Sequence, residues 1–217
     1  MKIEWQTTPF NTVALVCHEE PLDSPPLWKQ VHYNLPATPT FNPHREALAA
    51  TLSFINYFNG NLRVPGKLLS STYKVLNDWL SDREFTVSNI HYSAAIFPSY
   101  GESELKVITN RHPSFKQARN LKDPRKALLQ LVDGNYWHGY IRSTHTLTLT
   151  SNHFYIGASG KPGDLFFNLL STGILFSESL LCDIIAIDRL HSESVNQQTI
   201  EILRSLLNSV GLKLKLI

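Results

Sequence analysis

Apolar and polar positions alternate at both ends of the chain, in the pattern of β-strands. Near the amino terminus, Ile3 and Trp5 alternate with polar residues and indicate a strand with one buried face. Residues 13–17 form a continuous apolar run, which is typical of a central strand. Over residues 212–216, leucines alternate with lysines, and these lysines would keep a sheet edge from pairing further.

Three segments between these ends also predict strands. Residues 86–97 alternate, and residues 104–109 are expected to return beside them as a hairpin partner. Residues 183–188 are short and mostly apolar, so they predict a buried strand.

Apolar residues at helical spacing predict three helices, a long apolar run predicts a fourth, and a capping pattern predicts a fifth. The three periodic segments are residues 44–58, 67–81 and 194–210, and the apolar run is residues 163–181. The fifth helix is expected to begin at Asp123-Pro124, where an N-cap side chain precedes a proline at the first helical position. Gly134 would end it.

Residues 18–43 are set apart by their prolines, which are Pro21, Pro25, Pro26, Pro36, Pro39 and Pro43. Because proline breaks helices and cannot donate a hydrogen bond within a central strand, we expect an irregular segment here. It would wrap over the surface with Leu27 and Trp28 as anchors.

Strands and helices in mixed order predict an α+β fold. We expect one globular domain over residues 1–217, with a mixed sheet that contains a long hairpin. About five helices would cover this sheet, mainly on one face.

Composition adds little to the choice of function. The chain has 217 residues, of which 42% are hydrophobic and 18% charged, and its net charge of +2 does not by itself indicate nucleic-acid binding. Cys17 and Cys182 lie in apolar runs and are expected to be buried, reduced thiols. No stretch approaches the roughly 18 apolar residues of a membrane span. We therefore expect a soluble, cytoplasmic protein with no membrane association.

A long hairpin over residues 137–156 gives the sharpest functional hypothesis. A two-residue turn at Ser151-Asn152 would pair Thr150 with His153 and Thr148 with Tyr155. One polar face would then gather His138, Tyr140, Arg142, His153 and Tyr155. A solvent-exposed strand is also polar, but such a face more typically carries Lys, Glu and Thr.

On that hypothesis each side chain has a role. Arg142 would hold an anion with the help of Tyr140, while His138, His153 and Tyr155 are the candidates for acid–base catalysis. Residues 157–163 form a glycine-rich connection, which is either flexible or contributes to anion binding at the end of the hairpin.

Two short motifs resemble known enzyme families. His91-Tyr-Ser93 is similar to the His-x-Thr/Ser motif of two-histidine phosphoesterases, which implies that His91 would face a phosphodiester. The second motif, from His145 to Thr148, departs in spacing, and its histidine is expected on the apolar face. Gly139-Tyr140-Ile141 and residues 155–157 resemble, out of order, the strands of GIY-YIG nucleases, although the helix after Gly163 lacks that family's arginine.

Carboxylates near the middle of the chain allow a metal-dependent nuclease as a further alternative. The residues concerned are Asp82, Glu84, Glu102, Glu104 and Lys106. Two carboxylates would bind a divalent ion while the lysine supports the attacking water, but a charged hairpin tip explains the pattern equally well. His18-Glu19-Glu20 has no second ligand cluster, so we predict no metal site, and no cofactor is indicated.

Residues 111–126 form the one basic segment. Its cations are Arg111, Lys116, Arg119, Lys122, Arg125 and Lys126, against the single acid Asp123. The segment would bind phosphates of a nucleic acid or nucleotide, or an acidic patch on a partner protein, unless it is simply a solvated surface.

Two functional hypotheses remain. In the first, the protein is a binding protein or a subunit of a complex that engages a nucleic acid or another phosphate-bearing ligand through the hairpin face and the basic segment. The alternative is a histidine-dependent enzyme that processes phosphodiesters on the same hairpin face.

Overall fold

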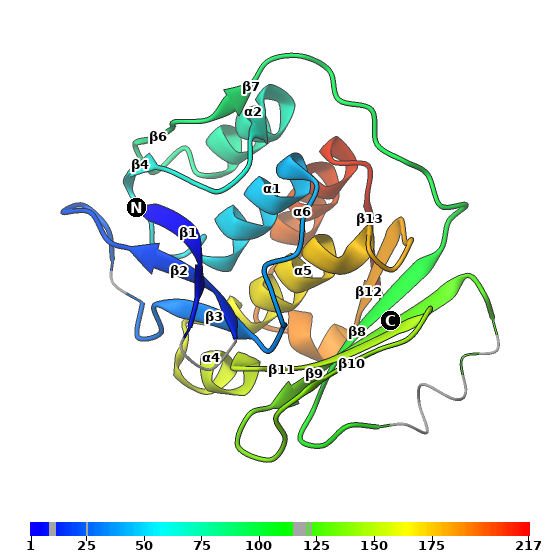
Figure 1. The fold of residues 1–217 in the computed structure, drawn as a ribbon. Coiled ribbons are helices and arrows are strands. Elements are labelled where there is room, and N and C mark those ends of the chain that lie inside the picture. The colour runs from blue at the N-terminus through cyan, green and yellow to red at the C-terminus, as the bar shows by residue number, and fades with distance from the viewer. Residues whose placement is uncertain (9–11, 25, 115–120, 122) are drawn as a thin grey trace.

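The computed structural model describes residues 1–8, 12–24, 26–114, 121 and 123–217. Nine strands in these ranges form the main sheet: β1 Lys2–Thr7, β2 Val13–His18, β3 Gln30–Tyr33, β8 Glu104–Asn110, β9 Lys126–Asp133, β10 Tyr140–Arg142, β11 Thr146–Ser151, β12 Ile184–Ile187 and β13 Lys213–Leu216. Their order is β1-β2-β3-β11-β9-β8-β12-β13, and β10 pairs with β11 outside this path (Figure 1).

The main sheet joins a parallel half to an antiparallel half. Strands β11, β9, β8, β12 and β13 run parallel to one another, in that order. Strands β1, β2 and β3 are antiparallel, as is the β10–β11 pair. A single antiparallel pair, Ser151 with Tyr33, joins β11 to β3. The two halves therefore meet at the carboxyl end of β11.

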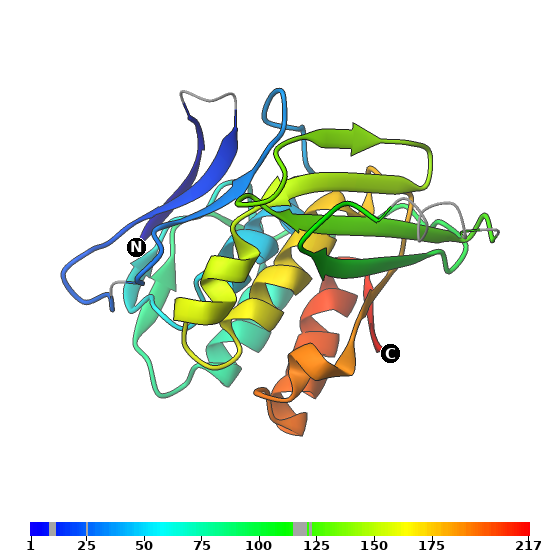
Figure 2. The ribbon, with the colours of Figure 1, turned by 90° about the horizontal axis from the view of Figure 1, so that it is seen from below.

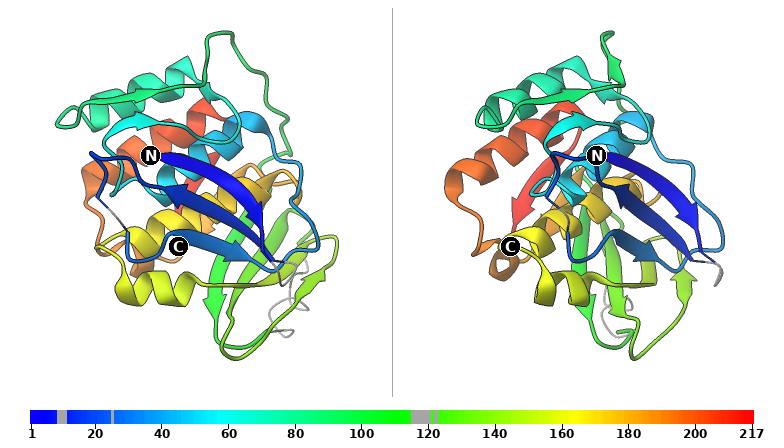
Figure 3. Two further views of the ribbon diagram at one scale, coloured as in Figure 1. Left: turned by 60° about the vertical axis from the view of Figure 1, so that its left-hand side comes forward. Right: turned by 90° about the vertical axis from the view of Figure 1, so that its left-hand side faces the viewer.

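Helices cover mainly one face of the sheet, as Figure 2 shows. The described α-helices are α1 Pro43–Ser53, α2 Ser70–Trp79, α4 His153–Ser159, α5 Asp164–Ser177 and α6 Gln197–Ser209, with a short 3₁₀ helix, η1, at Arg189–Ser192. Two small parallel sheets, β4 Gly60–Leu62 with β6 Phe85–Val87 and β5 Leu68–Leu69 with β7 Ile90–His91, lie beside α2 (Figure 3). This arrangement confirms the predicted mixed α+β fold.

Helix α5 lies at the centre of the core. Its residues from Phe166 to Ser177 are all buried, as expected of a helix that is apolar on every side. Gly173 lets the helix approach the sheet closely, because a Cβ atom there would lie 2.7 Å from Ile185 Cγ2 and 3.1 Å from Val107 Cγ2. Both of these side chains belong to central parallel strands.

The predicted helix at 123–134 is wrong, because this segment contains the central strand β9. Asp123 does cap a backbone amide, that of Arg125, but only within a turn. Leu128, Leu129 and Val132 are all buried, so the apolar run is shielded on both faces of the sheet. Such continuous burial favours a strand over the local capping signal.

Two other strand predictions also need correction. Residues 104–109 belong to β8, which lies parallel between β9 and β12 and is not a hairpin partner of residues 86–97. Those residues contribute the end of β6 and the whole of the two-residue strand β7, followed by an irregular segment. Within this irregular segment Ile96 is 97% exposed.

The proline-rich segment contains a strand that we did not expect. β3 occupies the proline-free stretch between Pro26 and Pro36 and pairs with β2 over four residues. Trp28 is buried as an anchor, whereas Leu27 is 76% exposed.

Other features agree with what the sequence predicts. Cys17 and Cys182 are buried, and burial raises the pKa of each thiol to about 12. At the β13 edge, Lys213 pairs with Glu102 and Lys215 with Glu104. Among the helices of the described ranges, none combines the length and the apolar character that crossing a lipid bilayer requires.

The close packing of α5 predicts that Gly173→Val is destabilising. The added methyl groups would force Ile185 and Val107 apart, and such overpacking typically lowers the free energy of unfolding by about 1–3 kcal/mol. Urea denaturation would measure it. The matched control Ser205→Val, on the exposed side of α6, should change stability by less than about 0.5 kcal/mol. Equal effects of the two variants would contradict this account of α5.

Candidate functional site

The hairpin exists, but its turn and its register differ from the prediction. Tyr140 pairs with Leu149 and Arg142 with Leu147, so the chain turns at residues 143–145. Residues 153–159 are the helix α4. His153 and Tyr155 therefore do not lie opposite Thr150 and Thr148, and the predicted polar face does not form.

Asn152 explains why the strand ends there. Its side-chain oxygen accepts a hydrogen bond from His32 N at 2.9 Å, and its side-chain amide donates to Gln30 O at 2.8 Å. These two bonds attach Asn152 to the backbone of β3. The chain then turns into α4 instead of returning along β11.

The predicted ligand-binding residues do not gather at one site, although Arg142 and Tyr140 share the strand β10. Arg142 is exposed and donates to Ser179 O at 3.0 Å. Tyr140 lies beside it on β10, whereas His91 lies on β7, where its ring stacks on His44 at the start of α1 with 5.0 Å between centroids. His145, expected in the core, is exposed at the hairpin turn.

The basic segment is only partly described. Arg111 is exposed just beyond the carboxyl end of β8, while Lys116 and Arg119 lie outside the described residues.

Two of the predicted catalytic candidates, His138 and Tyr155, do meet in one cavity. This cavity, hereafter the polar cavity, measures about 350 Å³ and lies where the carboxyl ends of β9 and β11 meet β3 and α4. Its described lining residues are Thr12, His32, Asn34, Asp133, Gly134, Asn135, His138, Thr150, Ser151, Asn152 and Tyr155.

A tight turn after β9 positions one wall of the polar cavity. Asp133 Oδ1 accepts a hydrogen bond from Asn135 N at 2.9 Å, which fixes the carboxylate at the start of the turn. Thr150 ties down the far end of this turn, because its hydroxyl accepts from Gly139 N at 2.9 Å and donates to Trp137 O at 3.0 Å. Between these two anchors, His138 is presented to the cavity.

His153 lies behind the cavity wall and is fully buried. Burial lowers the pKa of its imidazole to about 4, so the ring is neutral near pH 7. Its Nε2 lies 3.3 Å from Asn168 O, and because a carbonyl oxygen only accepts, we assign the proton to Nε2. Nδ1 is then the acceptor for the hydroxyl of Ser151, which lines the cavity.

This hydrogen-bond chain continues into the core. The hydroxyl of Thr172 lies 3.1 Å from His153 Nε2 and 2.9 Å from the hydroxyl of Tyr33. Burial raises the pKa of Tyr33, so its phenol stays protonated. His153 thus orients Ser151 and does not reach the ligand space itself.

The polar cavity offers hydrogen-bonding groups with little charge. Among its described lining residues, Asp133 is the only acid and no lysine or arginine is present. Three carboxamides, two imidazoles, three aliphatic hydroxyls and a phenol supply the remaining polar groups. Burial lowers the pKa of His32, which favours its neutral form. The arrangement therefore suits a polar ligand without a negative charge.

Sequence reasoning missed most of this cavity. Asn34, Asp133 and Asn135 were not candidates, although Asp133-Gly134-Asn135 is a turn sequence directly after an apolar run. Reading residues 126–133 as a strand would have placed this turn at a carboxyl end of the sheet, where ligands commonly bind in α/β folds.

No metal centre competes with this assignment in the part of the chain that the structure describes. There, no group of three or more His, Cys, Asp or Glu side chains could hold an ion.

Comparisons with known proteins add no assignment. No family model matches the chain, and no significant match exists among curated proteins or solved structures.

The burial of His153 predicts how stability depends on pH. In the unfolded chain a histidine takes up a proton near pH 6.5, whereas folded His153 stays neutral down to about pH 4. The folded state therefore loses stability as pH falls between these values, by up to about 1.4 kcal/mol per pH unit. His153→Gln should weaken this dependence, as measured by urea unfolding at several pH values. If the free energies of unfolding of the wild type and the variant differ by the same amount at every pH, that result would argue against a buried neutral ring.

Proposed function

We propose that this protein binds a small, uncharged, polar molecule in the polar cavity. The observation that carries the proposal is the composition of the cavity wall, in which carboxamides, imidazoles and hydroxyls surround a single carboxylate. Such groups pair with hydroxyls, amides and ring nitrogens through directional hydrogen bonds. Nucleosides and neutral sugars carry these groups.

The position of the cavity supports the proposal. Ligands in sheets with parallel strands commonly bind beyond the carboxyl ends of these strands, and β9 and β11 end here. A volume of about 350 Å³ also lies within the range of small-molecule pockets.

A phosphate-bearing ligand is less well supported. Arg142 already donates to a backbone carbonyl and is not among the lining residues of the cavity. Arg111 and Arg125, from the basic segment, lie at opposite ends of the parallel strands β8 and β9. Because Glu104 pairs with Lys126, the two arginines lie eight residues apart along the strand direction, which is about 26 Å, and they do not form one patch.

Binding is also better supported than catalysis. Ser151 is hydrogen-bonded to His153 in the way a nucleophile is bonded to its base. However, a fully buried imidazole with a pKa of about 4 is a weak base, far from the near-neutral pKa that general-base catalysis favours. Ser151 is therefore a hydrogen-bonding group of the cavity in this proposal.

Saturation-transfer NMR with adenosine, uridine, glucose and their phosphorylated counterparts would test this function. We expect an uncharged compound to bind more tightly than its phosphorylated counterpart, because Asp133 repels phosphate. Tyr155→Ala should weaken binding about tenfold, which corresponds to about 1.4 kcal/mol. Tyr92→Ala is the matched control, because Tyr92 is an exposed tyrosine outside the cavity. Preferential binding of the phosphorylated compounds, or equal effects of the two variants, would refute the proposal.

A further inference from the structure

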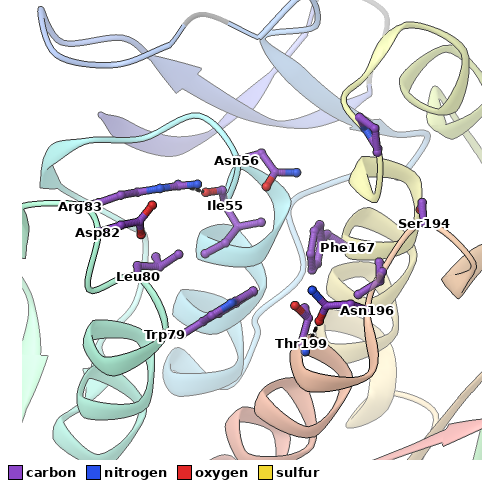
Figure 4. A pocket seen from close by; sticks show the side chains of 12 residues that line it. Ile55, Asn56, Trp79, Leu80, Asp82, Arg83, Phe167, Ser194, Asn196 and Thr199 are labelled. Carbon is purple, nitrogen blue, oxygen red and sulfur yellow. Dashed lines mark hydrogen bonds between the residues drawn. The ribbon is translucent and has the colours of Figure 1, made fainter.

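A second cavity lies among the helices and shares no lining residue with the polar cavity. This helix-end cavity measures about 350 Å³. It is lined by Ile55, Asn56, Trp79, Leu80, Asp82, Arg83, Pro162, Phe167, Ser194, Val195, Asn196 and Thr199 (Figure 4). These residues come from the ends of α1 and α2 and from the beginnings of α5 and α6.

Aromatic and aliphatic side chains form the floor of the helix-end cavity. Ile55, Leu80 and Phe167 are buried, and Trp79 is half-buried at the end of α2. The rings of Trp79 and Phe167 lie 6.2 Å apart between centroids and are tilted by 52°. The half-buried ring of Trp79 keeps part of its apolar surface open to the cavity, and a flat or branched apolar group that packs there loses contact with water.

Two opposite charges stand together on one side of this floor. Figure 4 shows Asp82 and Arg83 across the cavity from Ser194 and Asn196. Arg83 Nη1 donates to Ile55 O at 2.6 Å, which holds the guanidinium in place and leaves its other N–H groups for a ligand. In the described ranges, neither side chain has an ion-pair partner within 4.0 Å.

The opposite wall supplies neutral hydrogen-bonding groups. Asn196 Oδ1 caps α6 by accepting from Thr199 N at 2.8 Å, which leaves the Asn196 side-chain amide as a donor. Asn56 donates to Asp164 Oδ1 at 2.8 Å, which leaves its own side-chain oxygen as an acceptor. The charged groups of a ligand in this cavity would therefore be recognised by Asp82 and Arg83.

We propose that the helix-end cavity binds a small zwitterion with an apolar side chain, namely a free amino acid of the phenylalanine or leucine type. Arg83 binds the carboxylate, Asp82 binds the ammonium group, and the side chain packs on Trp79 and Phe167. A simple anion would meet repulsion from Asp82, and a simple cation would meet repulsion from Arg83. Only a ligand with both charges satisfies both residues.

Isothermal titration of the full chain with three related compounds tests this directly. L-Phenylalanine carries both charges, 3-phenylpropionate lacks the ammonium group, and phenethylamine lacks the carboxylate. We expect phenylalanine to bind at least about tenfold more tightly than either analogue, since each analogue loses one attraction and keeps one repulsion. Equal or tighter binding of either analogue, or no binding of phenylalanine at millimolar concentration, would overturn the proposal.

Two variants then assign the charges. Asp82→Asn should weaken phenylalanine binding and narrow its advantage over 3-phenylpropionate, because the repulsion of a lone carboxylate is removed. Arg83→Gln should likewise weaken phenylalanine binding and narrow its advantage over phenethylamine, because the repulsion of a lone ammonium group is removed. The matched controls are Asp78→Asn and Arg63→Gln, at exposed positions outside the cavity. A uniform loss of all three ligands, in which neither variant changes the order of preference, would contradict the assigned roles.

Discussion

The complete burial of α5 is the constraint from which the rest of this structure follows. A helix that is apolar on every side must be covered on every side, and here the sheet lies on one side and α1 and α4 on others. Gly173 lets the helix approach β8 and β12 closely. The few polar side chains within the helix bond to its own backbone, as Ser171 does to Phe167 O and Thr172 to Asn168 O.

The amino end of α5 connects the helices that surround the two cavities. Asp164 is buried, and a buried carboxylate is tolerated only when it is well hydrogen-bonded. It accepts from Asn56 on one oxygen and from Tyr57 and Lys161 N on the other. The end of α1 is thereby joined to the loop between α4 and α5. Tyr155 before this loop lines the polar cavity, and Phe167 after it lines the helix-end cavity.

The sequence predicted those elements whose burial pattern is set locally. The alternation in β1 and β13 and the helical spacing in α6 each follow from one face or side of a single segment, and α5 follows from the length of its apolar run. β9 could not be recognised in this way, because Asp123-Pro124 also fits the start of a helix and an apolar run alone fits a helix or a strand. Only its pairing with β8 and β11, distant in sequence, decides between them. The polar cavity was missed for the same reason. One of its walls is the turn that follows β9, and this turn could not be placed without recognising β9 as a strand.

The polar cavity exists because one edge of β11 pairs with two different strands. Residues 147–149 pair with β10, whereas Ser151 pairs with Tyr33 of β3. Two strands cannot occupy one edge at the same position, so β10 and β3 separate near Thr150. Backbone groups at this point need other partners, and they find them in Asn34 N, which donates to Thr150 O, and in the Thr150 hydroxyl, which bonds the turn before β10. The polar side chains needed to end one pairing and begin another therefore gather at a single point of the sheet, and this gathering forms a hydrogen-bonding cavity.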